Sequence, residues 1–136
     1  MSDESSVLAA ADACIAAFGR HDRDAYFARF APHATFIFHT TPGVLASRAD
    51  WEREWDRLVA EDGFRVLSCQ SLDRRVQLLG DEAAVFSHRV LTRSTSREGE
   101  IDTDERETIV FQRRPDGSWL AVHEHLSPTP DAGTGG

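Results

Sequence analysis

The sequence predicts a single α+β domain, in which helices from the first part of the chain pack on a curved antiparallel β-sheet. Three observations support this prediction. The 136 residues suffice for one domain of ordinary size. Apolar residues recur at helical spacing near the start, and strand-like alternation fills the second half. We expect residues 1–127 to form the domain and residues 128–136, rich in proline, glycine and threonine, to form a flexible tail.

Three helices are expected. The first spans about Ser6 to Phe18, where apolar residues recur every three or four positions. The second is short, starts after the capping residue Asp22 and carries Phe30 near its end. The third follows Ser47, a residue typical of an N-cap, and ends at the Asp62-Gly63 pair.

Five strands are expected from β-branched, aromatic and alternating segments. They span residues 35–39, 64–79, 83–93, 103–113 and 118–127. The last two are joined by Pro115-Asp116-Gly117, whose composition is typical of a tight turn. Helices followed by a meander of strands place the helices together on one face of the sheet.

Composition and charge exclude several classes of function. The formal net charge is −8, and the 15 basic residues, all arginines, are scattered among 23 acidic ones, so nucleic acid is not an expected partner. No apolar run approaches the length that a membrane span needs. The acidic start lacks the features of a secretory signal, which indicates a cytoplasmic protein. Cys14 and Cys69 are expected to be buried thiols in a reducing compartment.

Two glutamates are predicted to meet on an otherwise apolar face of the last two strands. A tight turn centred on Asp116 places Ile109 opposite Val122 and Glu107 opposite Glu124. When two carboxyl groups lie so close together, the ionisation of both is disfavoured. One pKa therefore rises, and the pair titrates as a unit. Such a pair can act as acid or base near neutral pH. The alternatives are neutralisation by an arginine or a solvated strand end.

The closing segment is similar to a known family. Gly117-Ser118-Trp119, followed by residues 122–127 with the sequence Val-His-Glu-His-Leu-Ser, resembles the last strand of SnoaL-like proteins. These belong to the nuclear transport factor 2-like superfamily, which includes ketosteroid isomerase. The association domain of calcium/calmodulin-dependent kinase II ends in a similar pattern. The resemblance covers about Val7 to Ser127 and implies a cone-shaped sheet, wrapped by three N-terminal helices, around a single pocket.

The resemblance also implies which side chains face that pocket. By similarity to ketosteroid isomerase, the pocket-facing strand residues are Glu107, Ile109, Phe111, Val122, Glu124 and Leu126. Similarity to the kinase association domain places His88 on the same side. Trp51 and Trp55, four residues apart on the third helix, form either a packed core stripe or an aromatic wall for a flat apolar ligand.

The polar groups of ketosteroid isomerase are missing from this chain. That enzyme uses an aspartate base and an oxyanion hole of tyrosine and aspartic acid. The matching positions are Phe38, Cys14 and Ile109, so steroid-isomerase chemistry is not implied. Phe38 and Cys14 are then expected in the pocket wall, the latter as an inert buried thiol.

Two functions therefore remain open. One is an enzyme that transfers protons on a small, largely apolar cyclic or polyketide-type molecule by isomerisation, cyclisation, elimination or hydration, without metal or organic cofactor. Glu124 is then the base, Glu107 shares its proton and His88 is the partner donor. The alternative is a non-catalytic module of the same fold that binds a small molecule or dimerises. An assembly domain like the kinase hub is disfavoured because the chain carries no partner domain.

The two histidines beside Glu124 are expected on the opposite, convex face. His123 and His125 have a spacing that can present two imidazoles to one metal, but no third ligand is evident, so no metal site is expected. Together with Trp119 they would leave an aromatic surface exposed. This predicts a homodimer through the convex face.

Overall fold

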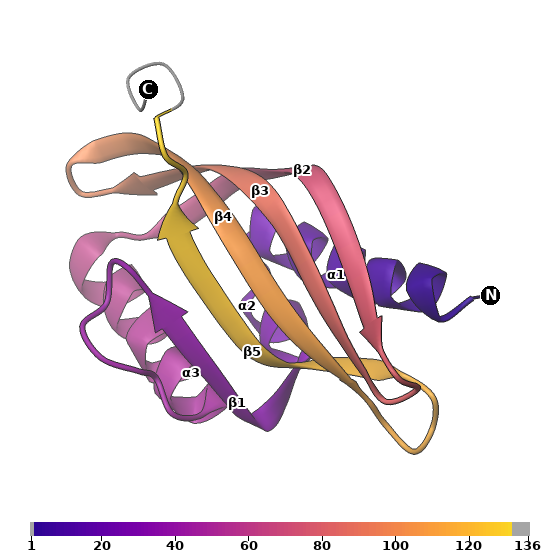
Figure 1. Ribbon diagram of the computed structural model, residues 1–136. Coiled ribbons are helices and arrows are strands. Elements are labelled where there is room, and N and C mark those ends of the chain that lie inside the picture. Colours follow the sequence, from indigo (N-terminus) through magenta and orange to yellow (C-terminus); the bar gives the residue numbers. More distant parts are fainter. Residues whose placement is uncertain (1, 132–136) are drawn as a thin grey trace.

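The computed structural model describes residues 2–131 and has the predicted order of helices and strands (Figure 1). The elements are α1 (Asp3–Gly19), α2 (Arg23–Phe27), β1 (Phe30–Phe38), α3 (Arg48–Arg57), a π-helical turn η1 (Leu58–Asp62), β2 (Arg65–Leu79), β3 (Ala83–Ser96), β4 (Gly99–Arg113) and β5 (Trp119–Pro128). Within the described part of the chain, no helix has the length and apolar character needed to cross a membrane.

The helices begin where capping side chains stand. The Ser2 hydroxyl accepts a hydrogen bond from the Ser5 N–H, so α1 starts earlier than the apolar pattern indicated. Asp22 and Ser47 cap α2 and α3 as predicted. Phe30, predicted in the second helix, instead opens β1 and pairs with Ala121. The nearby Pro32 disfavours helical backbone in the residue before it, which ends the helix early.

The five strands form one mixed sheet in the order β1-β5-β4-β3-β2. β2, β3, β4 and β5 pair antiparallel, as predicted, whereas β1 pairs with β5 in parallel. The long connection between these two strands leaves their relative direction free, because no hairpin joins them. The expectation of an entirely antiparallel sheet was wrong at this edge.

The register between β4 and β5 differs from the predicted one. Glu107 pairs with Leu126, and Glu124 pairs with Ile109, so the two glutamates are diagonal neighbours rather than directly opposite. Two displacements of one residue cause this. The connecting loop occupies residues 114–118, and a β-bulge leaves Val122 without a partner. The two displacements add up to two residues, which is one full side-chain period of a strand, so both glutamates still share one face.

The bulge also changes which residues point inward in the part of β5 that precedes Val122. Trp119 and Ala121 were assigned to the convex face with the two histidines, but both are buried in the core, and Trp119 is only 3% exposed. Trp119 therefore adds no exposed aromatic surface, and that part of the argument for a convex-face dimer was wrong. Between Trp119 and His123 the alternation is interrupted, because Val122 is the extra residue.

The core lies between the sheet and the helices. α1 packs against β2, β3 and β5, crossing behind β2 and β3 in Figure 1, and α3 packs against β1. Aromatic rings from α2, β1 and α3 fill the space between them. At the other end, β5 continues to Pro128, and the Thr129 N–H donates to the Asp104 carbonyl, so residues 128 and 129, predicted in the tail, pair with the sheet. Residues 132–136 of that tail lie outside the described residues.

Candidate functional site

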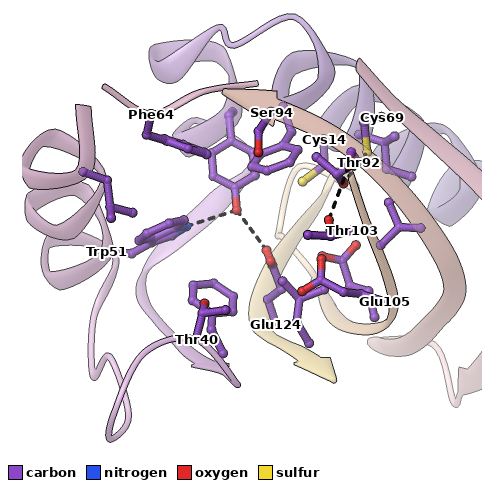
Figure 2. A pocket seen from close by; sticks show the side chains of 18 residues that line it. Cys14, Thr40, Trp51, Phe64, Cys69, Thr92, Ser94, Thr103, Glu105 and Glu124 are labelled. Carbon is purple, nitrogen blue, oxygen red and sulfur yellow. Dashed lines mark hydrogen bonds between the residues drawn. The ribbon is translucent and has the colours of Figure 1, made fainter. Parts of the chain in front are cut away.

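One cavity opens on the concave side of the sheet, between α1, α3 and the strands β3, β4 and β5. It has a volume of about 190 Å³ and is lined by 18 residues. Its walls are mostly apolar, and the polar groups gather on the sheet (Figure 2). The lining carboxyl groups belong to Glu105, Glu107 and Glu124. An apolar pocket with a few converging polar groups is the usual form of a small-molecule site.

On the helix side, Glu124 is held by a chain of two hydrogen bonds that starts at Trp51 and passes through Tyr26. The Trp51 Nε1–H donates to the Tyr26 hydroxyl over 3.1 Å, and that hydroxyl donates to Glu124 Oε1 over 3.0 Å, both bonds drawn in Figure 2. Helical spacing brings Trp51 to the cavity side of α3, while Tyr26 comes from the short α2. Glu124 is 4% exposed, so this carboxyl depends on protein partners for its hydrogen bonds.

Glu107 is held on the sheet side by His88. The two residues are directly paired across β3 and β4, and His88 Nε2 lies 2.6 Å from Glu107 Oε1. The other ring nitrogen of His88, Nδ1, lies 2.6 Å from the Ser71 hydroxyl on β2. A neutral imidazole with its proton on Nε2 satisfies both contacts, because it donates to Glu107 and accepts from Ser71.

The pKa values of these groups are shifted mainly by burial. Desolvation lowers the pKa of His88 to about 4, which keeps the ring neutral at physiological pH. Desolvation raises the pKa of Glu107 to about 7. The pKa of Glu124 is raised well above its usual range, first by burial and then by the nearby charge of Glu107.

The two carboxyl groups influence each other, because a hydrogen bond from protonated Glu124 to Glu107 raises the pKa of Glu124 and lowers that of Glu107. The hydrogen bonds of this network are then all donated toward Glu107, from Trp51 at one end and from His88 at the other. Trp51 donates to Tyr26, Tyr26 to Glu124, and Glu124 to Glu107, which also accepts from His88. Among the described residues, no arginine forms an ion pair with either glutamate. The pair therefore holds one proton in an apolar cavity, an arrangement suited to acid–base chemistry.

The cavity wall contains some of the predicted residues and omits others. Those that line it are Cys14, Phe38, Trp51, Glu107, Glu124 and Leu126. Ile109 and Phe111 point to the same side of the sheet but are buried in the core beside the cavity. Val122 does not line it, because the bulge displaces this residue. His88 lies behind Glu107 and reaches the cavity only through it.

The two tryptophans of α3 have different environments. Trp51 lines the cavity and donates to Tyr26. Trp55 is 1% exposed, does not line the cavity and is surrounded by aromatic rings, including Phe18 and Phe64. The core alternative therefore holds for Trp55, and an aromatic wall is formed by Trp51.

Two contributors to the site were missed from the sequence. Tyr26 donates to Glu124 across 98 positions of the chain, and no local pattern signals such a contact. Glu105 lines the cavity two residues before Glu107, and its carboxylate lies 2.5 Å from His39 at the rim. Strand alternation places Glu105 and Glu107 on one face, so this signal was present in the sequence.

The histidines of β5 point away from the cavity, as expected. His123 Nδ1 lies 2.8 Å from the Thr35 hydroxyl, and His125 is exposed. Across residues 2–131, no three His, Cys, Asp or Glu side chains are grouped so as to hold a metal ion. The polar side chains that line the cavity supply carboxyl, phenol, thiol and hydroxyl groups, and His88 adds an imidazole behind Glu107.

Comparison with protein families gives one match over most of the chain. A family described as "Calcium/calmodulin dependent protein kinase II association domain" matches residues 3–130. The calcium/calmodulin-dependent protein kinase type II alpha chain of Drosophila melanogaster is 27% identical over 113 residues, or 83% of this chain. The chain spans only 21% of that relative's length.

Solved structures agree with this match. A putative calcium/calmodulin-dependent protein kinase II association domain from Xanthomonas campestris has a TM-score of 0.78 at 25% identity, covering 97% of this chain and 91% of that one. A ketosteroid isomerase-like protein from Erwinia carotovora has a TM-score of 0.80 at 16% identity, covering 96% and 100%. The second similarity shows the fold alone. It confirms the predicted likeness in fold to ketosteroid isomerase.

Proposed function

The chain belongs to the calcium/calmodulin-dependent protein kinase II association domain family. We propose that the cavity of this domain transfers protons on a small molecule. The observation that carries the proposal is the Glu107–Glu124 pair. Its two carboxyl groups lie on one face of the sheet and line an apolar cavity of about 190 Å³, where burial raises the pKa of both. Isomerisation, elimination, cyclisation or hydration all need an acid and a base placed in this way.

The pKa directions suggest which carboxyl acts as base. Glu107 has a pKa of about 7 and is largely ionised just above neutral pH, whereas Glu124 keeps its proton. We therefore assign the base to Glu107 and the acid to Glu124, the reverse of the expectation from sequence. Tyr26 and Trp51 would hold Glu124 in place, and His88 would hold Glu107.

The cavity volume restricts the substrate. Sites for drug-sized ligands measure about 300–1,000 Å³, and this cavity is smaller. A molecule of one ring, or two small fused rings, fits it better than a polycyclic polyketide. Phe38, Trp51 and Phe64 provide flat walls for such a ring.

A generic proton-transfer substrate tests the proposal directly. We expect the protein to open 5-nitrobenzisoxazole, a small neutral bicycle that loses one carbon-bound proton to a base while its N–O bond breaks. The rate above buffer should rise with pH through about 7 as Glu107 ionises. Glu107→Gln should lower that rate by about 100-fold or more, because the base is lost. Product absorbance measures the rate.

The matched control is Glu98→Gln, since Glu98 is exposed on the β3–β4 hairpin. This variant should retain the rate of the unmodified protein. If Glu107→Gln is as fast as Glu98→Gln, or if the unmodified protein does not exceed buffer, the cavity is not a proton-transfer site.

A second function, self-association, is favoured by the family match rather than by the cavity. The matching family is named for an association domain. The convex face carries half-buried apolar residues such as Val85 and Val110 beside His123, and a second copy would cover them. Self-association and a ligand-binding cavity are compatible, because they use opposite faces of the sheet.

Light scattering coupled to size-exclusion chromatography tests this function. We expect a dimer or larger assembly at micromolar concentration. Val110→Asp, which places a charge in the convex face, should lower the mass, because a buried unpaired charge opposes association. Val44→Asp, at an exposed position in the loop between β1 and α3, is the control and should not change the mass. A monomer for the unmodified protein contradicts the proposal.

A further inference from the structure

The cavity combines three carboxyl groups with a wall free of basic side chains. Glu105, Glu107 and Glu124 line it, and no arginine or histidine is among its lining residues in the described chain. The sequence contains no lysine. The imidazoles of His39 and His88 contact Glu105 and Glu107 from outside the wall, and His88 stays neutral. No permanently charged cation therefore lines the described wall, and the charges of Arg29 and Arg74 act from outside it, on Cys14 and His88.

Groups around the cavity respond to this negative field. The pKa of the Cys14 thiol and that of the Tyr26 phenol are raised well above their usual ranges, first by burial and then by the charges of Glu124 and Glu107. The pKa of Cys69 is raised to about 12 by burial and by the same glutamates. Three neighbouring groups on three different elements therefore resist becoming negative.

Opposite the carboxyl groups, the wall is aromatic. Phe18, Tyr26, Phe38, Trp51 and Phe64 all line the cavity. Phe38 and Trp51 meet edge to face, with ring centroids 4.9 Å apart. The negative faces of such rings attract organic cations, and the attraction grows when the cation is removed from water. Carboxylates on one side and aromatic rings on the other are complementary to a molecule with both a positive charge and an apolar body.

We propose that the cavity selects a small organic cation, a protonated amine carried on a single apolar ring, over neutral or anionic molecules of the same shape. The ammonium group lies between Glu105 and Glu107, which are two residues apart on one face of β4. The ring lies against Phe38 and Trp51. This inference names the ligand class of the cavity and so rests on the proposed function.

Three probes of equal shape and different charge test the inference. Calorimetric titration at about pH 8, where Glu107 is ionised, compares benzylammonium, benzyl alcohol and benzoate. We expect benzylammonium to bind about tenfold or more tightly than benzyl alcohol, and benzoate to show no binding. Equal or tighter binding of benzyl alcohol or benzoate overturns the inference, as does an absence of benzylammonium binding.

Single variants locate the bound charge. Glu105→Gln and Glu107→Gln should each weaken benzylammonium binding by about tenfold and leave benzyl alcohol within about twofold. Glu98→Gln is the matched control and should bind all probes as the unmodified protein does. If Glu107→Gln does not fold, Glu105→Gln alone decides, because Glu105 is not part of the Glu107–Glu124 pair. Unchanged benzylammonium binding in these variants overturns the inference.

The inference and the proposed function fail in different ways. If the protein opens 5-nitrobenzisoxazole through Glu107 but does not prefer benzylammonium, proton transfer stands and the choice of ligand class is wrong. If benzylammonium binds selectively but no rate exceeds buffer, the cavity is a cation-binding site without catalysis.

Discussion

Glu107→Gln is expected to make the protein more stable above neutral pH while leaving its stability near that of the unmodified protein at about pH 4.5. Burial raises the pKa of Glu107 from 4.5 to about 7, so the folded state binds this proton more tightly than the unfolded state. Stability from a raised pKa is present below the unfolded value and is lost as pH rises through the folded value. Relative to that of the variant, the free energy of unfolding of the unmodified protein should fall by roughly 3 kcal/mol between about pH 4.5 and about pH 7.

The comparison with a variant is necessary because the titration of His88 changes the stability of the protein with pH in the opposite direction. Its pKa is lowered from 6.5 to about 4, so the folded state gains stability as pH rises between these values. In the unmodified protein the two effects offset each other over much of the same range. The difference between Glu107→Gln and the unmodified protein reports the Glu107 effect together with its coupling to His88 and Glu124, which both interact with Glu107.

Urea unfolding at a series of pH values measures the effect. Glu98→Gln should show no pH-dependent difference, because Glu98 is exposed. The Glu107→Gln protein could instead be less stable than the unmodified one by the same amount at every pH. That result would show that ionisation of Glu107 does not destabilise the folded protein. That result would also remove the basis for assigning it the role of base.

Trp55→Ala is expected to lower the free energy of unfolding by about 3–5 kcal/mol. Trp55 is 1% exposed and is surrounded by aromatic rings. It stacks on His21 and Tyr26, with centroids 5.0 and 5.6 Å away, and meets Phe64 edge to face at 5.2 Å. Alanine would leave a cavity where α2, α3 and the start of β2 meet, and packed rings cannot move far enough to fill it.

The control for this variant is Val59→Ala, one turn further along the chain, where Val59 is 41% exposed. Its effect should stay within about 0.5 kcal/mol. Equilibrium unfolding in urea compares the two. A loss of less than about 1 kcal/mol for Trp55→Ala would contradict the claim that Trp55 is a rigidly packed part of the core.

The comparison between sequence and structure is clearest at the two glutamates. Strand alternation and the register expected from the Pro115-Asp116-Gly117 turn placed Glu107 and Glu124 on one face. That placement survives two register displacements because together they amount to one full side-chain period. The directly opposite pairing did not survive. The length of the loop at residues 114–118 and the bulge at Val122 arise from how β5 fits between β4 and β1, which no local pattern in β5 records.

The sequence by itself determined the helices, the strands, the shared face of the two glutamates and the absence of the ketosteroid isomerase groups. These follow from local periodicity, capping residues and residue identity. Only the tertiary structure decided that Tyr26 holds Glu124, that Trp51 and not Trp55 lines the cavity, and that Trp119 is buried. Each of these depends on contacts between segments far apart in the chain, where the packing of the whole domain selects among arrangements that local sequence permits equally.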